Sequence, residues 1–338
     1  MKSFWFLGRQ SRRFSATTKE PCSTLVRPPH TFPDHAQGNA RWLEFKSFDP
    51  VPAEQEQSWF KTMKRAEFVR NESLSGPNPQ AIVWHHTPEM HMLRLPLTLP
   101  GSEMLGGQFL FVRDSALELI KLVRSLPVAC AVGNTGKSVF QWIYLLAIFR
   151  PDIYQALTGE PSFPPAPVPS PSHPNHHHGA KNVVATTTEP PSTIVHVQRG
   201  GTRAFVYLME DEQVFQIHRE VPAVVNMFKA PHHLLIWEPT SAVGGGITFD
   251  ELDGGMQILA VVSPDNLGHL GKRKDYHFCY MPCPSSAELL GMAKFLRERV
   301  RDENHLLGDE LVRDRIRVFG PIVRHVLPSD HILHQRFT

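Results

Sequence analysis

Residues 127–149 read PVACAVGNTGKSVFQWIYLLAIF, and they carry the clearest structural signal in the sequence. It opens with a short apolar run of strand type, residues 127–132, which leads directly into the segment GNTGKS. The run VFQWIYLLAIF that follows is apolar on nearly every side, which is typical of a buried helix. A glycine-rich turn between a buried strand and a buried helix is the setting that a phosphate-binding P-loop requires. The sequence therefore predicts a strand, a P-loop and a helix in this order.

The loop itself, AVGNTGKS, follows the P-loop pattern with Ala131 in place of the first glycine. Gly133 and Gly136 allow the backbone to turn its N–H groups toward phosphate oxygens. Lys137 brings a positive charge to the β- and γ-phosphates, and the Ser138 hydroxyl is a ligand for Mg²⁺. We therefore expect ATP and Mg²⁺ as cofactors, whereas the alternative is an ordinary strand-to-helix turn with a fortuitous lysine. The expected cofactor-binding residues are Ala131, Gly133, Asn134, Thr135, Gly136, Lys137 and Ser138.

A carboxylate is also needed near the phosphates, to hold Mg²⁺ and to orient the attacking water. The apolar segment HHLLIWEP supplies Glu238 at the end of an expected buried strand. Aspartate is the usual residue at the metal position, and one extra methylene moves the carboxylate by about 1.5 Å. We therefore expect Glu238 to reach the metal through a water, or to act as the base for the attacking water. The alternative is a strand-end glutamate paired with a nearby basic residue.

A third polar candidate, Ser263, follows the apolar run of MQILAVVSP. This run is expected to be another buried strand, and a polar residue just beyond such a strand is placed to contact the γ-phosphate. The segment Ser-Pro-Asp-Asn is also common turn chemistry, so a plain turn is the alternative for Ser263.

Composition excludes several classes of function. The chain has 338 residues, with 35 basic and 33 acidic side chains, so the overall charge gives no general case for nucleic-acid binding. No run of about eighteen apolar residues occurs, and no membrane-spanning helix is expected. The four cysteines are too few and too scattered for a disulfide framework, which favours an intracellular, reducing compartment.

Changes of composition divide the chain into four parts. Residues 1–19 are a basic, flexible N-terminus, in which RRFSATT resembles a mitochondrial presequence near its cleavage point; a basic tail is the alternative. Residues 20–94 are expected to be an irregular N-terminal region, since their periodicity is weak. Residues 160–193 are rich in proline and histidine, and a disordered insertion is expected because they cannot bury enough apolar surface to order. The predicted P-loop NTPase domain is made of residues 95–159 and 194–338.

The other elements of this domain follow from periodicity and turn signals. Phe109 to Val112 read as a strand, and a helix is expected after them, ending by Pro127. RAFVYLM and QVFQIH, joined by an acidic turn, predict paired strands. A helix is expected from Ser285, with Glu288 completing a capping box. Buried strands separated by helices indicate an α/β fold with a mostly parallel sheet, whose strand order the sequence does not give.

The order of these pieces resembles the P-loop ATPase domain of the retrotransposon hot spot and Crinkler-type proteins of protozoa, oomycetes and fungi. FLFVRDSALELI precedes the loop, and RAFVYLM, LLIWEP and AVVSPDN follow it. Two later segments carry most of the resemblance, YMP…S..EL and FG.I.R. Their residues are Tyr280, Met281, Pro282, Glu288 and Leu289, and then Phe319, Gly320, Ile322 and Arg324. The resemblance extends from residue 109 to the C-terminus, interrupted by the Pro-rich insertion.

The resemblance implies a regulatory ATPase module, and known members include secreted effectors acting in a host nucleus and proteins linked to mobile elements. It also places Arg324 where a late arginine senses the γ-phosphate, with an ordinary surface arginine as the alternative. This chain departs from the pattern in having Glu238 instead of aspartate, and no LFLAK-like translocation segment is visible in it.

Three functions are therefore carried forward. The first is a slow, Mg²⁺-dependent ATPase switch, with Glu238, Ser263 and Arg324 as catalytic residues and Ser138 and Glu238 as metal ligands. The second is a catalytically degenerate nucleotide-binding module or effector that acts through an unidentified protein partner. The third is a nucleic-acid-associated protein of the mobile-element kind, which the basic segment GKRK at residues 271–274 also suggests, with a solvated loop as the alternative for that segment. The expected location is intracellular, in a mitochondrion by the N-terminus or in a nucleus or host cell by the resemblance.

Overall fold

The computed structural model describes most of the chain between residues 40 and 327. The described residues are 40–70, 78, 80–87, 90–96, 109–133, 136–160, 190–197, 203–218, 221–230, 232–238, 256–264, 277–299 and 307–327. The basic N-terminus at 1–19 and almost all of the Pro-rich insertion, residues 161–189, lie outside them.

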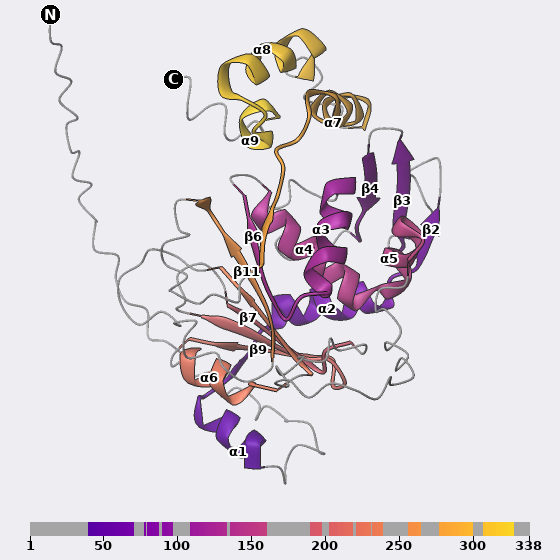
Figure 1. The fold of residues 1–338 in the computed structure, drawn as a ribbon. Coiled ribbons are helices and arrows are strands. Elements are labelled where there is room, and N and C mark those ends of the chain that lie inside the picture. The colour runs from indigo at the N-terminus through magenta and orange to yellow at the C-terminus, as the bar shows by residue number, and fades with distance from the viewer. Residues whose placement is uncertain are drawn as a thin grey trace, which may run out of the picture.

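A mixed sheet forms the centre of the part that the structure describes, and eight strands make it up in the order β1-β9-β8-β7-β10-β11-β6-β12 (Figure 1). In this order the strands are β1 Val51–Pro52, β9 Gln213–Ile217, β8 Ala204–Leu208, β7 Thr193–Val197, β10 His233–Trp237, β11 Gln257–Val262, β6 Val128–Val132 and β12 His277–Tyr280. The five strands from β7 to β12 run parallel, whereas β8, β9 and β1 add an antiparallel extension at one edge. The predicted α/β fold with a mostly parallel sheet is confirmed.

The central strands are mostly apolar because both faces of the sheet are covered. Along β6, Ala129 and Ala131 join the core on one face, and Val128, Cys130 and Val132 join the core on the other. This period of two explains why PVACAV reads as one continuous apolar run.

Helices cover the two faces of the sheet. One face carries α2 Glu54–Arg65, α3 Asp114–Arg124, α4 Lys137–Phe149 and α5 Pro151–Thr158. The other carries α1 Ala40–Ser47 and α6 Val221–Met227. Figure 1 shows these two groups of helices on opposite sides of the sheet. No described helix is long and apolar enough to cross a membrane.

A second, four-stranded sheet lies beside α3 and α5, in the order β2-β3-β4-β5. Its strands are β2 Phe68–Arg70, β3 Ile82–Thr87, β4 Met90–Arg94 and β5 Phe109–Val112. The C-terminal helices α7 Ser286–Arg299, α8 Asp309–Phe319 and α9 Val323–Val326 form a group at one end of the molecule (Figure 1). Phe295 of α7 packs against Val83 and Met92 of the small sheet, and Val312 of α8 and Val326 of α9 share a core with Met90 of β4.

The region expected to be irregular, residues 20–94, differs from that expectation where it is described. Residues 40–70 form α1, β1, α2 and β2, and Arg150 fastens them to the domain because it donates to the carbonyl groups of Met63 and Ala66. The expected boundary after residue 94 separates β4 from β5, although these two strands pair with each other. One reason for the difference is that β1 and β4 pair with β9 and β5, which lie outside the segment, and β propensity depends on such partners.

Candidate functional site

The glycine-rich loop, residues 133–138, joins β6 to α4 as predicted. Gly133 is buried, and its N–H donates to the carbonyl of Val262 on β11 at 3.1 Å. Gly136 has φ of 76° and is the residue before the helix, in the left-handed region that glycine adopts without strain. Phe140 then donates to the Gly136 carbonyl at 2.8 Å, the first hydrogen bond of α4. The loop is therefore anchored to the neighbouring strand at its start and to the helix at its end.

Lys137 is the first residue of α4, and its side chain turns back over the loop. Its Nζ donates to the Gly133 carbonyl at 2.9 Å, and the side chain is half-buried. The first N–H groups of a helix have no partner within it, and the positive end of the helix dipole lies at the same place. The ammonium group and the start of α4 therefore put positive charge at one point, where an anionic group is stabilised.

Three of the predicted residues of this loop are described only in part or not at all. Asn134 and Thr135 lie outside the described residues, as does the side chain of Ser138, although its backbone belongs to α4. Ala131 is fully buried within β6 and pairs with Val261 of β11 and Cys279 of β12. A buried Ala131 packs in the core, so whatever contacts a ligand in this segment comes after it.

Glu238 lies close to the glycine-rich loop although 100 residues of sequence separate it from Ser138. It follows β10 directly, and its N–H donates to the Val197 carbonyl of β7 at 3.2 Å. Its carboxylate accepts from Nε2 of Gln141, on α4, at 3.5 Å. Residues 137 and 141 are four apart and share one face of the helix. The structure therefore brings the Glu238 carboxylate to the helical face that also carries Lys137.

Gln141 connects Glu238 to a buried histidine. Nε2 of His196, on β7, lies 2.8 Å from Oε1 of Gln141. A carboxylate only accepts, so the amide nitrogen of Gln141 faces Glu238, its oxygen faces His196, and His196 must donate from Nε2. Burial lowers the pKa of His196 to about 4, which keeps the ring neutral near neutral pH. His196, Gln141 and Glu238 thus form a chain of hydrogen bonds with one defined direction.

Ser263 takes the position expected from the sequence, immediately after β11. β11 lies between β6, which precedes the loop, and β10, which precedes Glu238. Val262, the residue before Ser263, accepts from Gly133. Ser263 is half-buried and follows the strand that lies between the loop and Glu238. The carboxyl ends of these parallel strands therefore gather the loop, Ser263 and Glu238 at one edge of the sheet.

Arg324 stands in a different part of the molecule. Its backbone belongs to α9, in the C-terminal group of helices, and its side chain lies outside what the structure describes. Its proposed contact with a γ-phosphate stays a prediction. The GKRK segment at residues 271–274 also falls outside the described residues.

A pocket opens beside the loop on the side of α3. Its volume is about 400 Å³, solvent at its mouth included, and its walls come from the start of α3, the first turns of α4 and the segment after β12. The lining residues include Phe111, Ala116, Gly136, Val139, Met281 and Pro282. The pocket therefore borders the glycine-rich loop directly, at Gly136.

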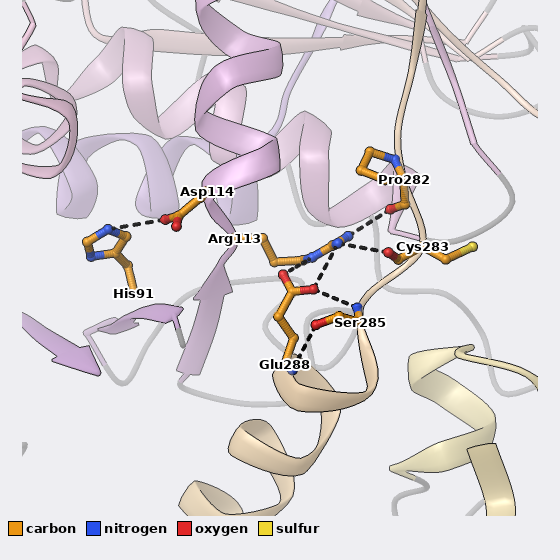
Figure 2. Close-up of polar contacts among 7 residues, drawn as sticks. All are labelled: His91, Arg113, Asp114, Pro282, Cys283, Ser285 and Glu288. Atoms are coloured by element: carbon orange, nitrogen blue, oxygen red, sulfur yellow. Dashed lines mark hydrogen bonds and ion pairs between the residues drawn. The ribbon is translucent and has the colours of Figure 1, made fainter. Parts of the chain in front are cut away.

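Arg113 fixes the wall of this pocket that is formed by the segment after β12 (Figure 2). Its guanidinium group donates to the Pro282 carbonyl at 2.9 Å, to the Cys283 carbonyl at 3.0 Å and to both carboxylate oxygens of Glu288, at 2.7 and 3.2 Å. Ser285 and Glu288 form the predicted capping box, because the Ser285 N–H donates to the carboxylate at 2.6 Å and the Glu288 N–H donates to the serine hydroxyl at 3.1 Å. One arginine thus joins the start of α3 to the start of α7.

Sequence reasoning missed Gln141, His196 and Arg113 as residues of this region. A signal for the first two was present, since a glutamine inside an apolar helix and a histidine inside TIVHV are buried polar groups that need partners. Among the described residues there is no group of three or more His, Cys, Asp or Glu side chains that could hold a metal ion. Mg²⁺ bound to phosphates needs only one or two protein ligands and keeps several waters, so one carboxylate and one hydroxyl fit it.

The chain was compared with known proteins. No protein-family model matches it, and no curated protein has a significantly similar sequence.

Proposed function

We propose that this protein binds ATP with Mg²⁺ at the glycine-rich loop and hydrolyses it slowly, as a P-loop ATPase. The observation that carries the proposal is the loop between β6 and α4, with Gly136 in the left-handed conformation and Lys137 turned over it. The start of a helix and a lysine beside it together provide the positive charge that a triphosphate needs.

Within this proposal the residues have separate tasks. Lys137 leaves the Gly133 carbonyl and binds the β- and γ-phosphates, because a phosphate oxygen is the stronger acceptor for an ammonium group. The Ser138 hydroxyl and the Glu238 carboxylate would hold Mg²⁺. Glu238 also accepts the proton of the attacking water, and Ser263 donates to the γ-phosphate. Mg²⁺ held there would supply positive charge to the phosphate oxygens.

The binding experiment uses a fluorescent ATP analogue with Mg²⁺, titrated into the whole protein and into Lys137→Ala. The parent is expected to bind and Lys137→Ala is expected to bind at least about tenfold more weakly, since a charge-assisted contact worth more than 1.4 kcal/mol is lost. Lys121→Ala is the matched control, because Lys121 is an exposed lysine of α3 that pairs with Glu160. Equal binding by the parent and Lys137→Ala, with both proteins folded, would show that the assigned site is wrong.

A second candidate function is a nucleotide-binding module without turnover. It is favoured by the contact between Glu238 and Gln141, since a carboxylate that accepts from this amide is partly occupied and less available to a water. Phosphate release by the parent and by Glu238→Gln separates the two functions. Release that is lost in Glu238→Gln while ATP still binds supports the ATPase; ATP binding without release by the parent supports the module.

The resemblance to retrotransposon hot spot and Crinkler-type ATPases is part of the same proposal. It rests on the order of the segments and on the YMP and FG.I.R motifs, and the arrangement of the loop, Ser263 and Glu238 at one edge of a parallel sheet agrees with it. A regulatory role, in which ATP binding changes an interaction with another protein, is the function that the resemblance favours.

A further inference from the structure

We propose that the pocket between α3, α4 and Met281–Pro282 takes the purine base of the nucleotide. This inference rests on the proposed function, because it assumes that the phosphates occupy the glycine-rich loop. It assigns a site to the base, which distinguishes one nucleotide from another. The sequence contains no recognisable base-binding motif.

The position of the pocket follows from Gly136, which belongs both to the loop and to the pocket lining. A ligand whose phosphates lie at the start of α4 has its remaining atoms within reach of this opening. Val139, one turn further along α4, continues the lining away from the loop. Phosphate and base would therefore contact consecutive parts of the same helix.

The chemistry of the lining suits a neutral, flat group. Phe111, Ala116, Val139 and Met281 present apolar atoms, and the charged side chain of Arg113 is already paired with Glu288. A phosphate or carboxylate group in this pocket would lose its hydration, and Arg113 would not compensate for that loss because it already pairs with Glu288. A purine loses little hydration over its faces, and a guanidinium group held in one plane is a surface on which aromatic rings stack.

The pocket is also shaped before any ligand arrives. Arg113 holds the Pro282 and Cys283 carbonyls, as Figure 2 shows, and the Met281 N–H donates to the Val132 carbonyl of β6 at 2.8 Å. The wall after β12 is therefore tied both to the sheet and to α3. The space between these walls amounts to about 400 Å³ when the solvent at its open mouth is included, so the pocket is an open cleft beside the loop.

The test compares ATP, UTP and inorganic tripolyphosphate, each with Mg²⁺, by isothermal titration calorimetry on the whole protein. If the base occupies the pocket, ATP binds at least about tenfold more tightly than tripolyphosphate. UTP falls between the two, since the smaller ring stacks over less surface. Equal affinities for ATP and tripolyphosphate would overturn the inference and leave the phosphate site standing. If neither compound binds, the proposed function fails, and the base pocket fails with it.

A variant locates the base within the protein. Ala116→Leu fills the pocket from α3 and is expected to weaken ATP binding about tenfold while leaving tripolyphosphate binding unchanged. Ala287→Leu is the matched control, because it makes the same change at an exposed position of α7 outside the pocket lining. Ala116→Leu that binds ATP as tightly as the parent, and is folded by circular dichroism, would place the base elsewhere.

Discussion

Among single residues, Gly136 has the conformation that matters most to the loop. Its φ is 76°, and a Cβ atom added there would meet nothing within 4 Å, so only the backbone conformation, and not space, requires glycine. Gly136→Ala is expected to cost about 1 kcal/mol of folding free energy and to weaken ATP binding, because alanine shifts the backbone out of the left-handed region. Urea denaturation and ATP titration measure the two effects.

Gly159 supplies the control for this substitution. It ends α5 with φ of 73° and has the same open space around it. Gly159→Ala is expected to lose a similar folding free energy and to bind ATP like the parent. A similar loss of binding in both variants would mean that general destabilisation, and not the loop, explains the result.

His196 makes a prediction about pH. Its pKa is lowered by burial from its ordinary value near 6.5 to about 4, so the unfolded chain takes up a proton between these values before the folded protein does. Above pH 6.5 the ring is neutral in both states, and the free energy of unfolding keeps its full value. As the pH falls from 6.5 toward 4, the free energy of unfolding decreases, because only the unfolded chain takes up the proton. The loss amounts to about 3 kcal/mol at 1.36 kcal/mol per unit.

The measurement is the free energy of unfolding as a function of pH for the parent and for His196→Gln, which keeps a donor toward Gln141. The difference between the two curves should grow smaller from pH 7 to pH 4, because only the parent loses the contribution of a neutral histidine. Parallel curves over this range would contradict the assignment of His196 as the buried neutral donor.

At the scale of elements, an ion pair joins the start of α3 to the start of α7. Arg113 and Glu288 are each less than one-fifth exposed, and the arginine also satisfies two backbone carbonyls. Burial by itself would raise the pKa of Glu288, but the hydrogen bonds from Arg113 and Ser285 and the charge of Arg113 lower it. Arg113→Met is therefore expected to cost about 2 kcal/mol, since a largely buried carboxylate and two carbonyls lose their partner.

The matched control is Arg317→Met on α8. Arg317 pairs with Asp314 at 3.2 Å, but both side chains are more than half exposed, and pairs of this kind contribute little to stability. Chemical denaturation of the two variants should separate them clearly. An equally small effect in both would show that Arg113 does not hold α7 to the rest of the molecule.

The elements differ in how far the sequence predicts them. The segment from β6 to α4 is predictable because its signal is local: one apolar run per element and glycines between them. β7 is not predicted from the sequence, because its apolar run TIVHV is short and follows a proline-rich stretch; the expected insertion includes only its first residue, Thr193. β12 has only Cys279 buried, so its sequence HFCY lacks the continuous apolar character of the inner strands.

The residues of the candidate site also differ in how far the sequence predicts them. The loop, Glu238 and Ser263 could be named from the sequence because each follows an apolar strand directly. Gln141 and His196 are brought together by the pairing of β7 with β10 and by the packing of α4 on the sheet, and the sequence gives neither the strand order nor the direction of a side chain. The same limit applies to Arg113, whose partners lie about 170 residues away in sequence.

At the scale of the whole molecule, the loop lies where the main layers meet. It joins β6, near the edge of the parallel sheet, to α4, which packs against α2, α3 and α5 on one face. The base pocket adds α3 and the segment that leads from β12 to the C-terminal helices. A nucleotide at this junction contacts the sheet, its helical layer and the connection to α7 at once, so binding is expected to stabilise the molecule as a unit.

The prediction is that Mg²⁺-ATP at a hundred times its dissociation constant raises the free energy of unfolding by about 2.7 kcal/mol. Thermal unfolding followed by circular dichroism should move to higher temperature by a few degrees, in a single transition. Lys137→Ala should show about half of this shift or less at the same ATP concentration, because binding at least about tenfold weaker lowers the stabilisation to about 1.4 kcal/mol or below. A shift of equal size in Lys137→Ala would mean that ATP stabilises the protein from another site. A shift confined to one of two separate transitions would mean that the C-terminal helices unfold independently of the sheet and that the nucleotide does not bridge them.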